Sequence, residues 1–143
     1  MLHILTGNQT TAISHEINRG RGITYHSHDY YGGFSREIAE SIRSNVLVVQ
    51  PSILLNEHEQ YQLGIDLCSA KCDVFLFTHS SSLINGIRVG VKRCYTLPTY
   101  VEIIFYTDHE FEEIQVDSKG NLSSYPDGLL DTWEIALLEL LKP

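Results

Sequence analysis

The sequence has few lysines, and none of them precedes Lys71. Ten basic residues stand against eighteen acidic ones, which gives a formal net charge of −8. Proteins that bind nucleic acid generally neutralise its phosphates with lysine and arginine. The excess of acidic residues therefore disfavours direct binding of nucleic acid as the general function of this chain.

Long apolar runs and paired cysteines are also missing. No stretch approaches the roughly 18–20 apolar residues that a membrane span needs, and the start MLHILTGNQ has neither the basic residues nor the long apolar segment of a leader. The three cysteines, Cys68, Cys72 and Cys94, are odd in number and form no close metal-type repeat. We expect reduced thiols in a cytoplasmic protein without a membrane segment.

What is present is an alternation of apolar and amphipathic runs along 143 residues, of which 43% are hydrophobic. This length suits one domain, residues 1–143. The pattern predicts an α/β three-layer sandwich with a mostly parallel sheet, a C-terminal β-hairpin and a closing helix. The expected strands are 2–5, 46–49, 74–77, 101–108 and 111–117, and the expected helices are 12–18, 34–42, 56–70, 81–87 and 131–141.

Several local signals refine this pattern. Pro51 cannot donate a ladder hydrogen bond, so the strand before it should end there. Asn56 and Glu59 have the spacing of a capping box at the start of a helix. The stretch DSKGN after the last strand is typical of a turn. In the closing helix, Trp133, Leu137 and Leu140 or Leu141 are expected to share an apolar face.

Two positions are candidates for a ligand site. His79 follows the apolar strand 74–77, and ligands of open α/β folds bind at the carboxyl ends of strands. The stretch TGNQTT lies between a strand and a helix, where unsatisfied amides favour an anion. Gly7, Asn8, Thr10 and Thr11 belong to this loop.

Other polar groups allow a functional and a structural interpretation. His26, His28 and Asp29 resemble half of a hydrolase metal motif, but they supply at most two or three ligands, so we favour a polar loop over a metal site. Arg19 and Arg21 would suit phosphate or carboxylate, but we favour a structural role as positive charges near a helix C-terminus. The serines 80–82 beside His79 suggest a hydrolase only weakly, because a serine at a helix start is normally a cap.

The order of VLVVQPSILLNEHEQ, FLFTHSSSLINGI, VEIIFY and DSKGNLSSYPDGLLD resembles the C-terminal part of ABC-type P-loop ATPases of the RecF, SMC and OLD-nuclease group, over about residues 32–131. This resemblance implies a P-loop-NTPase-like sheet. It matches His79 to the switch histidine near the terminal phosphate and Ser35 of GGFS to the signature loop. Gln50 ends the strand that resembles Walker B.

The chain departs from this family at the Walker A and Walker B positions, which carry out ATP hydrolysis in the family. Val49 and Ser52 occupy the positions of the Walker B carboxylates, which bind Mg²⁺ and orient water. The loop LTGNQTTAI lacks the second glycine and the lysine of G-x-x-x-x-G-K-[ST], although Thr10 or Thr11 could mimic the hydroxyl that binds the metal.

We therefore expect no catalytic residues, no metal and no cofactor. The resemblance implies a non-catalytic interaction or regulatory protein whose partner is itself or a full-length ATPase, in nucleic-acid metabolism or phage–host conflict. The alternative is an unconventional nucleotide-binding NTPase that holds ATP with Mg²⁺ through residues 6–11 and His79.

Overall fold

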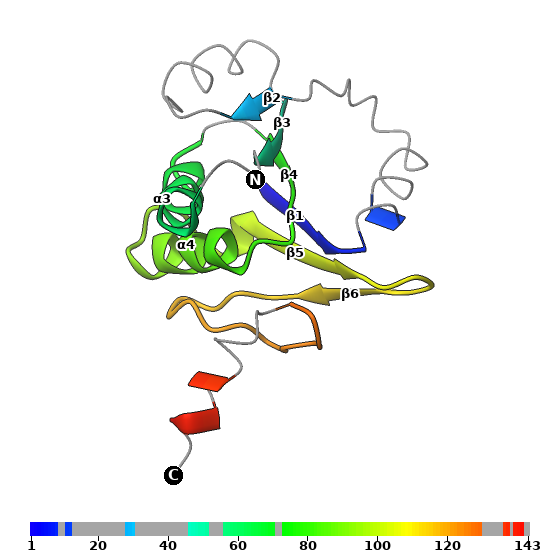
Figure 1. Ribbon diagram of the computed structural model, residues 1–143. Helices are drawn as coiled ribbons and strands as arrows, with labels where there is room; N and C mark the ends of the chain where they lie inside the picture. Colours follow the sequence, from blue (N-terminus) through cyan, green and yellow to red (C-terminus); the bar gives the residue numbers. More distant parts are fainter. Residues whose placement is uncertain are drawn as a thin grey trace.

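The computed structural model describes residues 1–8, 11–12, 28–30, 46–51, 56–70, 73–129, 136–137 and 139–141, with 28–30 and 46–51 described by backbone alone. The described residues form an α/β fold around one open, twisted sheet (Figure 1). None of the described helices is both long and apolar enough to cross a membrane.

Among the described residues, the sheet has six strands in the order β2-β3-β4-β1-β5-β6. Every neighbouring pair from β2 to β5 is parallel, and β6 runs antiparallel to β5. The mostly parallel sheet and the C-terminal hairpin that the sequence predicts are therefore confirmed. The strands are β1 (Leu2–Gly7), β2 (His28–Tyr30), β3 (Val46–Pro51), β4 (Asp73–Phe77), β5 (Val101–Tyr106) and β6 (Phe111–Ile114).

In the part of the chain that the structure describes, two helices cover one face of the sheet. They are α3 (Glu57–Leu67) and α4 (Ser81–Lys92), and a short 3-10 turn, Pro98–Tyr100, leads into β5. The main core lies beneath the two helices, where alternate residues of β1, β4 and β5, such as Ile4, Leu76 and Ile103, are fully buried. Apolar residues on both sides of these strands explain why they appear as continuous apolar runs in the sequence.

The opposite face of the sheet carries a second, smaller cluster. It contains Leu5 of β1, Phe75 and Phe77 of β4, and Ile104 and Tyr106 of β5, together with Ala12 from the segment that follows β1. Residues 11–12 are helical, as predicted for the start of the helix at 12–18. The rest of that helix and the one predicted at 34–42 lie outside the described residues, so the third layer stays a prediction.

The helices α3 and α4 touch through their backbones at a pair of glycines. A Cβ atom on Gly64 would stand 2.2 Å from the carbonyl oxygen of Leu83, and one on Gly86 would stand 2.1 Å from that of Tyr61. No side chain fits in this space, because real Cβ atoms do not approach backbone atoms so closely. The glycines therefore set the distance between the two helices.

The capping box predicted at the start of α3 is present. The Asn56 side chain accepts a hydrogen bond from the Glu59 amide at 2.8 Å, and the Glu59 carboxylate accepts one from the Asn56 amide at 3.2 Å. We expect Asn56→Ala to lower the free energy of unfolding by about 1 kcal/mol, because it leaves an orphan donor at the helix start. Urea denaturation measures this, with exposed His58→Ala as the control; equal stability of both variants would contradict the cap's role.

Cys68 and Cys94 are free thiols in contrasting surroundings. Burial, reinforced by Asp66, raises the pKa of Cys68 to about 12, while Cys94 is exposed. Since the thiolate is the reactive form, N-ethylmaleimide at neutral pH should modify Cys94 at least about 100-fold faster than Cys68. Peptide mass spectrometry over time tests this, and urea should remove the difference. Equal rates in the native protein would show that Cys68 is not protected.

The chain after β6 folds back against α4. Val116 pairs with Leu122 across the predicted turn, where the Asp117 carboxylate accepts hydrogen bonds from the amides of Lys119 and Asn121. The amide hydrogen bonds hold the pKa of Asp117 below its usual value. Leu122 and Leu129 are then buried in the main core. The turn predicted at DSKGN is thus confirmed.

The predicted closing helix does not pack as a closing element in its described part. Residues 136–137 and 139–140 are helical, but Leu137, Leu140 and Leu141 are 39%, 80% and 73% exposed. Figure 1 shows this red segment away from the sheet. Trp133 lies outside the described residues. The described leucines that should form the inner face of this helix are therefore exposed rather than packed against the described core.

Candidate functional site

The candidate site is the edge of the sheet where the parallel strands end. β1 lies between β4 and β5, and β3 lies next to β4. After β1 the chain continues to β2, β3 and β4, which all lie on one side of β1 in the sheet. After β4 it crosses to β5, which lies on the other side of β1. Adjacent strands whose chains leave in opposite directions define a topological switch point, where open α/β sheets bind ligands. Here that point lies beyond the carboxyl ends of β1 and β4.

At the end of β1, Gly7 is held tightly against β5. Its φ is +82°, and a Cβ there would stand 2.2 Å from the carbonyl oxygen of Tyr106. Both the left-handed conformation and the contact with neighbouring backbone require glycine. The chain turns here directly out of the sheet, so the next residue, Asn8, stands at the switch point.

Asn8 starts the helical turn after β1, and its own oxygen atoms accept hydrogen bonds from backbone amides of that turn. Its side-chain oxygen accepts a hydrogen bond from the Thr11 amide at 3.0 Å, and its carbonyl oxygen accepts one from the Ala12 amide at 3.0 Å. The amide of Asn8 itself donates to the carbonyl oxygen of Tyr106 at 2.8 Å. This is the arrangement of an N-cap. The described amides of this turn, which could have bound an anion, therefore already donate hydrogen bonds within the protein.

The side-chain amide of Asn8 makes a further contact that changes the charge of this edge. It donates a hydrogen bond to the carboxylate of Asp108, which follows β5. Asp108 thus brings a negative charge to the start of the helical turn, the position that would otherwise favour a phosphate. A bound phosphate would have to overcome repulsion from this carboxylate.

At the end of β4, the residues Thr78 to Ser80 link the strand to α4. The Thr78 amide donates to the carbonyl oxygen of Leu5 at 3.1 Å, which extends the pairing with β1 by one residue. Ser80 caps α4 by accepting a hydrogen bond from the Leu83 amide at 3.2 Å, as a serine at a helix start normally does. His79 stands between them with an exposed side chain.

The structure brings together part of the predicted set. Asn8 and Thr11 form one hydrogen-bonded turn directly after Gly7, and His79 lies at the same sheet edge, just after the neighbouring strand β4. Gln50 lies in β3, which pairs with β4 with Val49 opposite Leu76, so the end of β3 reaches this edge too. The side chain of Gln50, like Thr10 and Ser35, lies outside the described part of the chain.

Other predicted groups are only partly described. The backbone of His28 and Asp29 belongs to β2, but their side chains, as well as His26, Arg19 and Arg21, fall outside the description. Among the described residues, no three His, Cys, Asp or Glu side chains are placed to hold a metal ion.

Asp108 is the member of this edge that the sequence patterns did not reveal. It lies one hundred residues from Asn8 and meets it only because β1 and β5 are neighbours in the sheet. A signal was available: the polar stretch TDHE follows the apolar strand VEIIFY directly. The rule that singled out His79, a polar residue just after a parallel strand, also selects Asp108.

Comparison with known proteins gives one finding. Residues 98–140 match the model of a protein family of unknown function (DUF3696). The matched part comprises β5, β6, the turn at Asp117 and the C-terminal segment, so it does not include β1, β3 or β4. No curated protein matches the chain significantly. No solved structure does so either.

Proposed function

We propose that this chain is a non-catalytic, ATPase-like protein that acts by binding an ATPase partner. The observation that carries the proposal is the edge at the ends of β1 and β4. It has a turn and helix start after a central strand and Thr-His-Ser after its neighbour, yet the amides of Asn8, Thr11 and Ala12 are used internally. A sheet edge of this kind can keep the shape of a nucleotide site without binding a nucleotide.

The arrangement of the strands supports the relation to P-loop ATPases. β1, which leads into the loop that resembles Walker A, is adjacent to β4, and β4 is adjacent to the strand that resembles Walker B, β3. The three strands therefore end at one place, as a site shared between their loops requires. The match to DUF3696 begins in the C-terminal part of the stretch over which the resemblance extends and continues to residue 140.

The alternative, an unconventional NTPase that binds ATP with Mg²⁺ through residues 6–11 and His79, is less well supported. A triphosphate needs donors and positive charge, and Asp108 adds a carboxylate beside Asn8 instead. Val49 and Ser52 supply no carboxylate for the metal, and the first seventy residues contain no lysine.

A tagged chain, used as bait in a lysate of its source cells, tests the proposal. We expect a P-loop ATPase to be enriched and its ATP hydrolysis rate to change when the purified chain is added. His79→Glu should reduce capture at least about tenfold, because it places a charge on the exposed edge. His58→Glu makes the same change on the first turn of α3 and should not. Capture without an ATPase, or equal capture by both variants, would overturn the proposal.

Thermal denaturation with ATP or GTP, each with and without Mg²⁺, tests the alternative. Stabilisation grows as RT ln(1 + [L]/Kd), so a ligand at about a hundred times its Kd would add about 2.7 kcal/mol. We expect no shift of the melting temperature at millimolar nucleotide. A clear Mg²⁺-dependent shift that is lost in Asn8→Ala would favour the NTPase over the interaction protein.

A further inference from the structure

The connection between α4 and β5 exposes three large side chains with apolar surface. Tyr95, Leu97 and Tyr100 are 50%, 56% and 54% exposed, and we call residues 95–100 the tyrosine loop. It leads into the start of β5, so it lies at the opposite end of the sheet from the candidate site. Large apolar side chains exposed close together mark an interaction surface, and tyrosine often carries much of the binding energy there.

Hydrogen bonds hold the backbone of the tyrosine loop in place. At the end of α4, Cys94 has a φ of +61°, and the Tyr95 amide donates to the carbonyl oxygen of Gly90 at 3.0 Å. The Tyr100 amide closes a 3-10 turn on the carbonyl oxygen of Leu97 at 2.9 Å. Residues three apart in such a turn lie above one another, so Leu97 and Tyr100 face the same side. A surface fixed in this way loses little conformational entropy when it binds.

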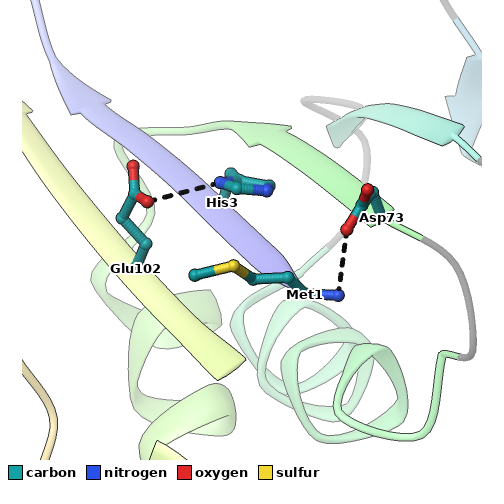
Figure 2. A network of polar contacts seen from close by, with 4 residues as sticks. All are labelled: Met1, His3, Asp73 and Glu102. Atoms are coloured by element: carbon teal, nitrogen blue, oxygen red, sulfur yellow. Dashed lines mark ion pairs between the residues drawn. The ribbon is translucent and has the colours of Figure 1, made fainter. Parts of the chain in front are cut away.

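The charged groups at the neighbouring start of β1 meet partners within the chain. β1 and β5 begin side by side in the sheet. The Met1 amine lies 3.2 Å from the carboxylate of Asp73, and Nδ1 of His3 lies 3.6 Å from a carboxylate oxygen of Glu102 (Figure 2). Both carboxylates therefore already face a basic group of the same molecule.

Two basic residues directly before the tyrosine loop differ in this respect. Lys92 is the last residue of α4 and Arg93 is its C-cap, and both are exposed. Neither forms an ion pair with another residue that the structure describes. On a chain with a net charge of −8, two such cations beside an apolar surface favour an occupant that is apolar and acidic.

The C-terminal segment, residues 136–141, has this chemistry. Leu137, Leu140 and Leu141 are 39%, 80% and 73% exposed, and Glu139 among them is exposed as well. The Leu141 amide donates to the carbonyl oxygen of Leu137 at 3.0 Å, and leucines three and four residues apart on such a helical turn are neighbours. Figure 1 shows the segment away from the sheet, where a second molecule can reach it.

We infer that the tyrosine loop receives the C-terminal segment of a second copy of this chain. The leucines of the segment pack on the two tyrosines and Leu97, and Glu139 pairs with Arg93. Each copy supplies one loop and one segment, so two identical contacts close a two-fold dimer. The dimer leaves the ends of β1 and β4 uncovered, and it is therefore independent of the proposed pairing with an ATPase.

Sedimentation velocity of the full chain, from about 1 to about 100 µM, tests the inference. We expect a concentration-dependent dimer. Tyr95→Ser with Tyr100→Ser should raise its dissociation constant at least about tenfold, and Leu140→Ser with Leu141→Ser should do the same. The melting temperature should stay unchanged, because all four side chains are exposed. Phe111→Ser removes an aromatic ring of similar exposure on β6 and should leave the dimer intact.

Mixing the two double variants shows whether the loop of one copy meets the segment of another. The loop variant keeps an intact segment, and the segment variant keeps an intact loop. A mixed pair therefore retains one of the two contacts, whereas each variant alone retains neither. We expect dimers in the mixture at concentrations at which each variant alone is a monomer.

A charge exchange tests the ion pair. Arg93→Glu and Glu139→Arg should each raise the dissociation constant about threefold, as expected for an exposed pair, and the two together should restore most of the dimer. A monomer at every concentration would overturn the inference, as would a dimer that survives both double variants or a mixture that associates no better than its components. A monomer that the leucine variant destabilises would place the segment on its own molecule instead. None of these results bears on capture of an ATPase at His79.

Discussion

Gly86→Ala is expected to lower the free energy of unfolding by about 3 kcal/mol. The new Cβ would stand 2.1 Å from the carbonyl oxygen of Tyr61 and 3.1 Å from Cα of Gly64, so the α3 backbone itself would have to move. Overpacking of this kind typically costs about 1–3 kcal/mol and sometimes more. On an open helix surface the same substitution would instead gain up to about 1 kcal/mol from helix propensity. A loss of stability would therefore show that the two helices are in contact, and a gain would show that they are not.

Urea denaturation measures this change, with Lys92→Ala as the control on the exposed last turn of α4. A second variant shows whether a flexible neighbour relieves the clash. At Gly90 an added Cβ would meet the Cys68 sulfur at 2.3 Å, so Gly90→Ala should be destabilising alone and less so together with Cys68→Ala. A stabilised Gly86→Ala protein would show that α3 and α4 are further apart than the structure has them.

Arg88→Ala is expected to cost about 2 kcal/mol and to loosen the segment after β6. Arg88 extends from α4, and its Nε donates to the carbonyl oxygen of Gly120 at 2.7 Å, while Nη1 donates to the Asn85 side chain at 2.9 Å. The guanidinium also lies 6.0 Å from the centre of the Tyr125 ring. Hydrogen bonds from charged donors contribute about 1.5–3 kcal/mol, and the carbonyl of Gly120 would lose its partner.

Hydrogen exchange at the amides of Gly120 and Asn121 locates the effect, and urea denaturation gives its size. Arg88→Lys keeps the charge without the planar fork and should restore less than half of the loss. Arg93→Ala removes an exposed arginine at the end of the same helix and serves as the control. Unchanged exchange in Arg88→Ala would mean that the turn is held by its own hydrogen bonds to Asp117 alone.

The two predictions concern contacts that no local pattern could have shown. The sequence marks Gly64 and Gly86 only as helix-weakening residues, and their role depends on the crossing of α3 and α4. Likewise, Arg88 reads as one basic residue on an amphipathic helix until Gly120 is placed beside it. In both cases the partner lies nineteen or more residues away, and its position follows from strand order rather than from local sequence.

Other features could be predicted because their physics is local. The capping box of Asn56 and Glu59, the strand end at Pro51 and the turn at Asp117 each depend on neighbours within a few residues. The apolar runs of β4 and β5 predicted strands buried on both faces, and Val74–Phe77 and Ile103–Tyr106 are buried. Helix α4 is longer than the sequence pattern predicts, since it continues to Lys92 rather than ending near Ile87.

For the candidate site, the sequence by itself determined which groups are present: Asn8 after one strand, His79 after another, and no lysine in the first seventy residues. Only the tertiary structure decided what those groups do. Asn8 turns inward to cap its own helical turn and binds Asp108, because β1 and β5 are neighbours. The tertiary structure likewise leaves Leu140 and Leu141 exposed. Composition and spacing act through neighbours in the chain, whereas the use of a donor or an apolar face depends on which distant surface the fold brings to it.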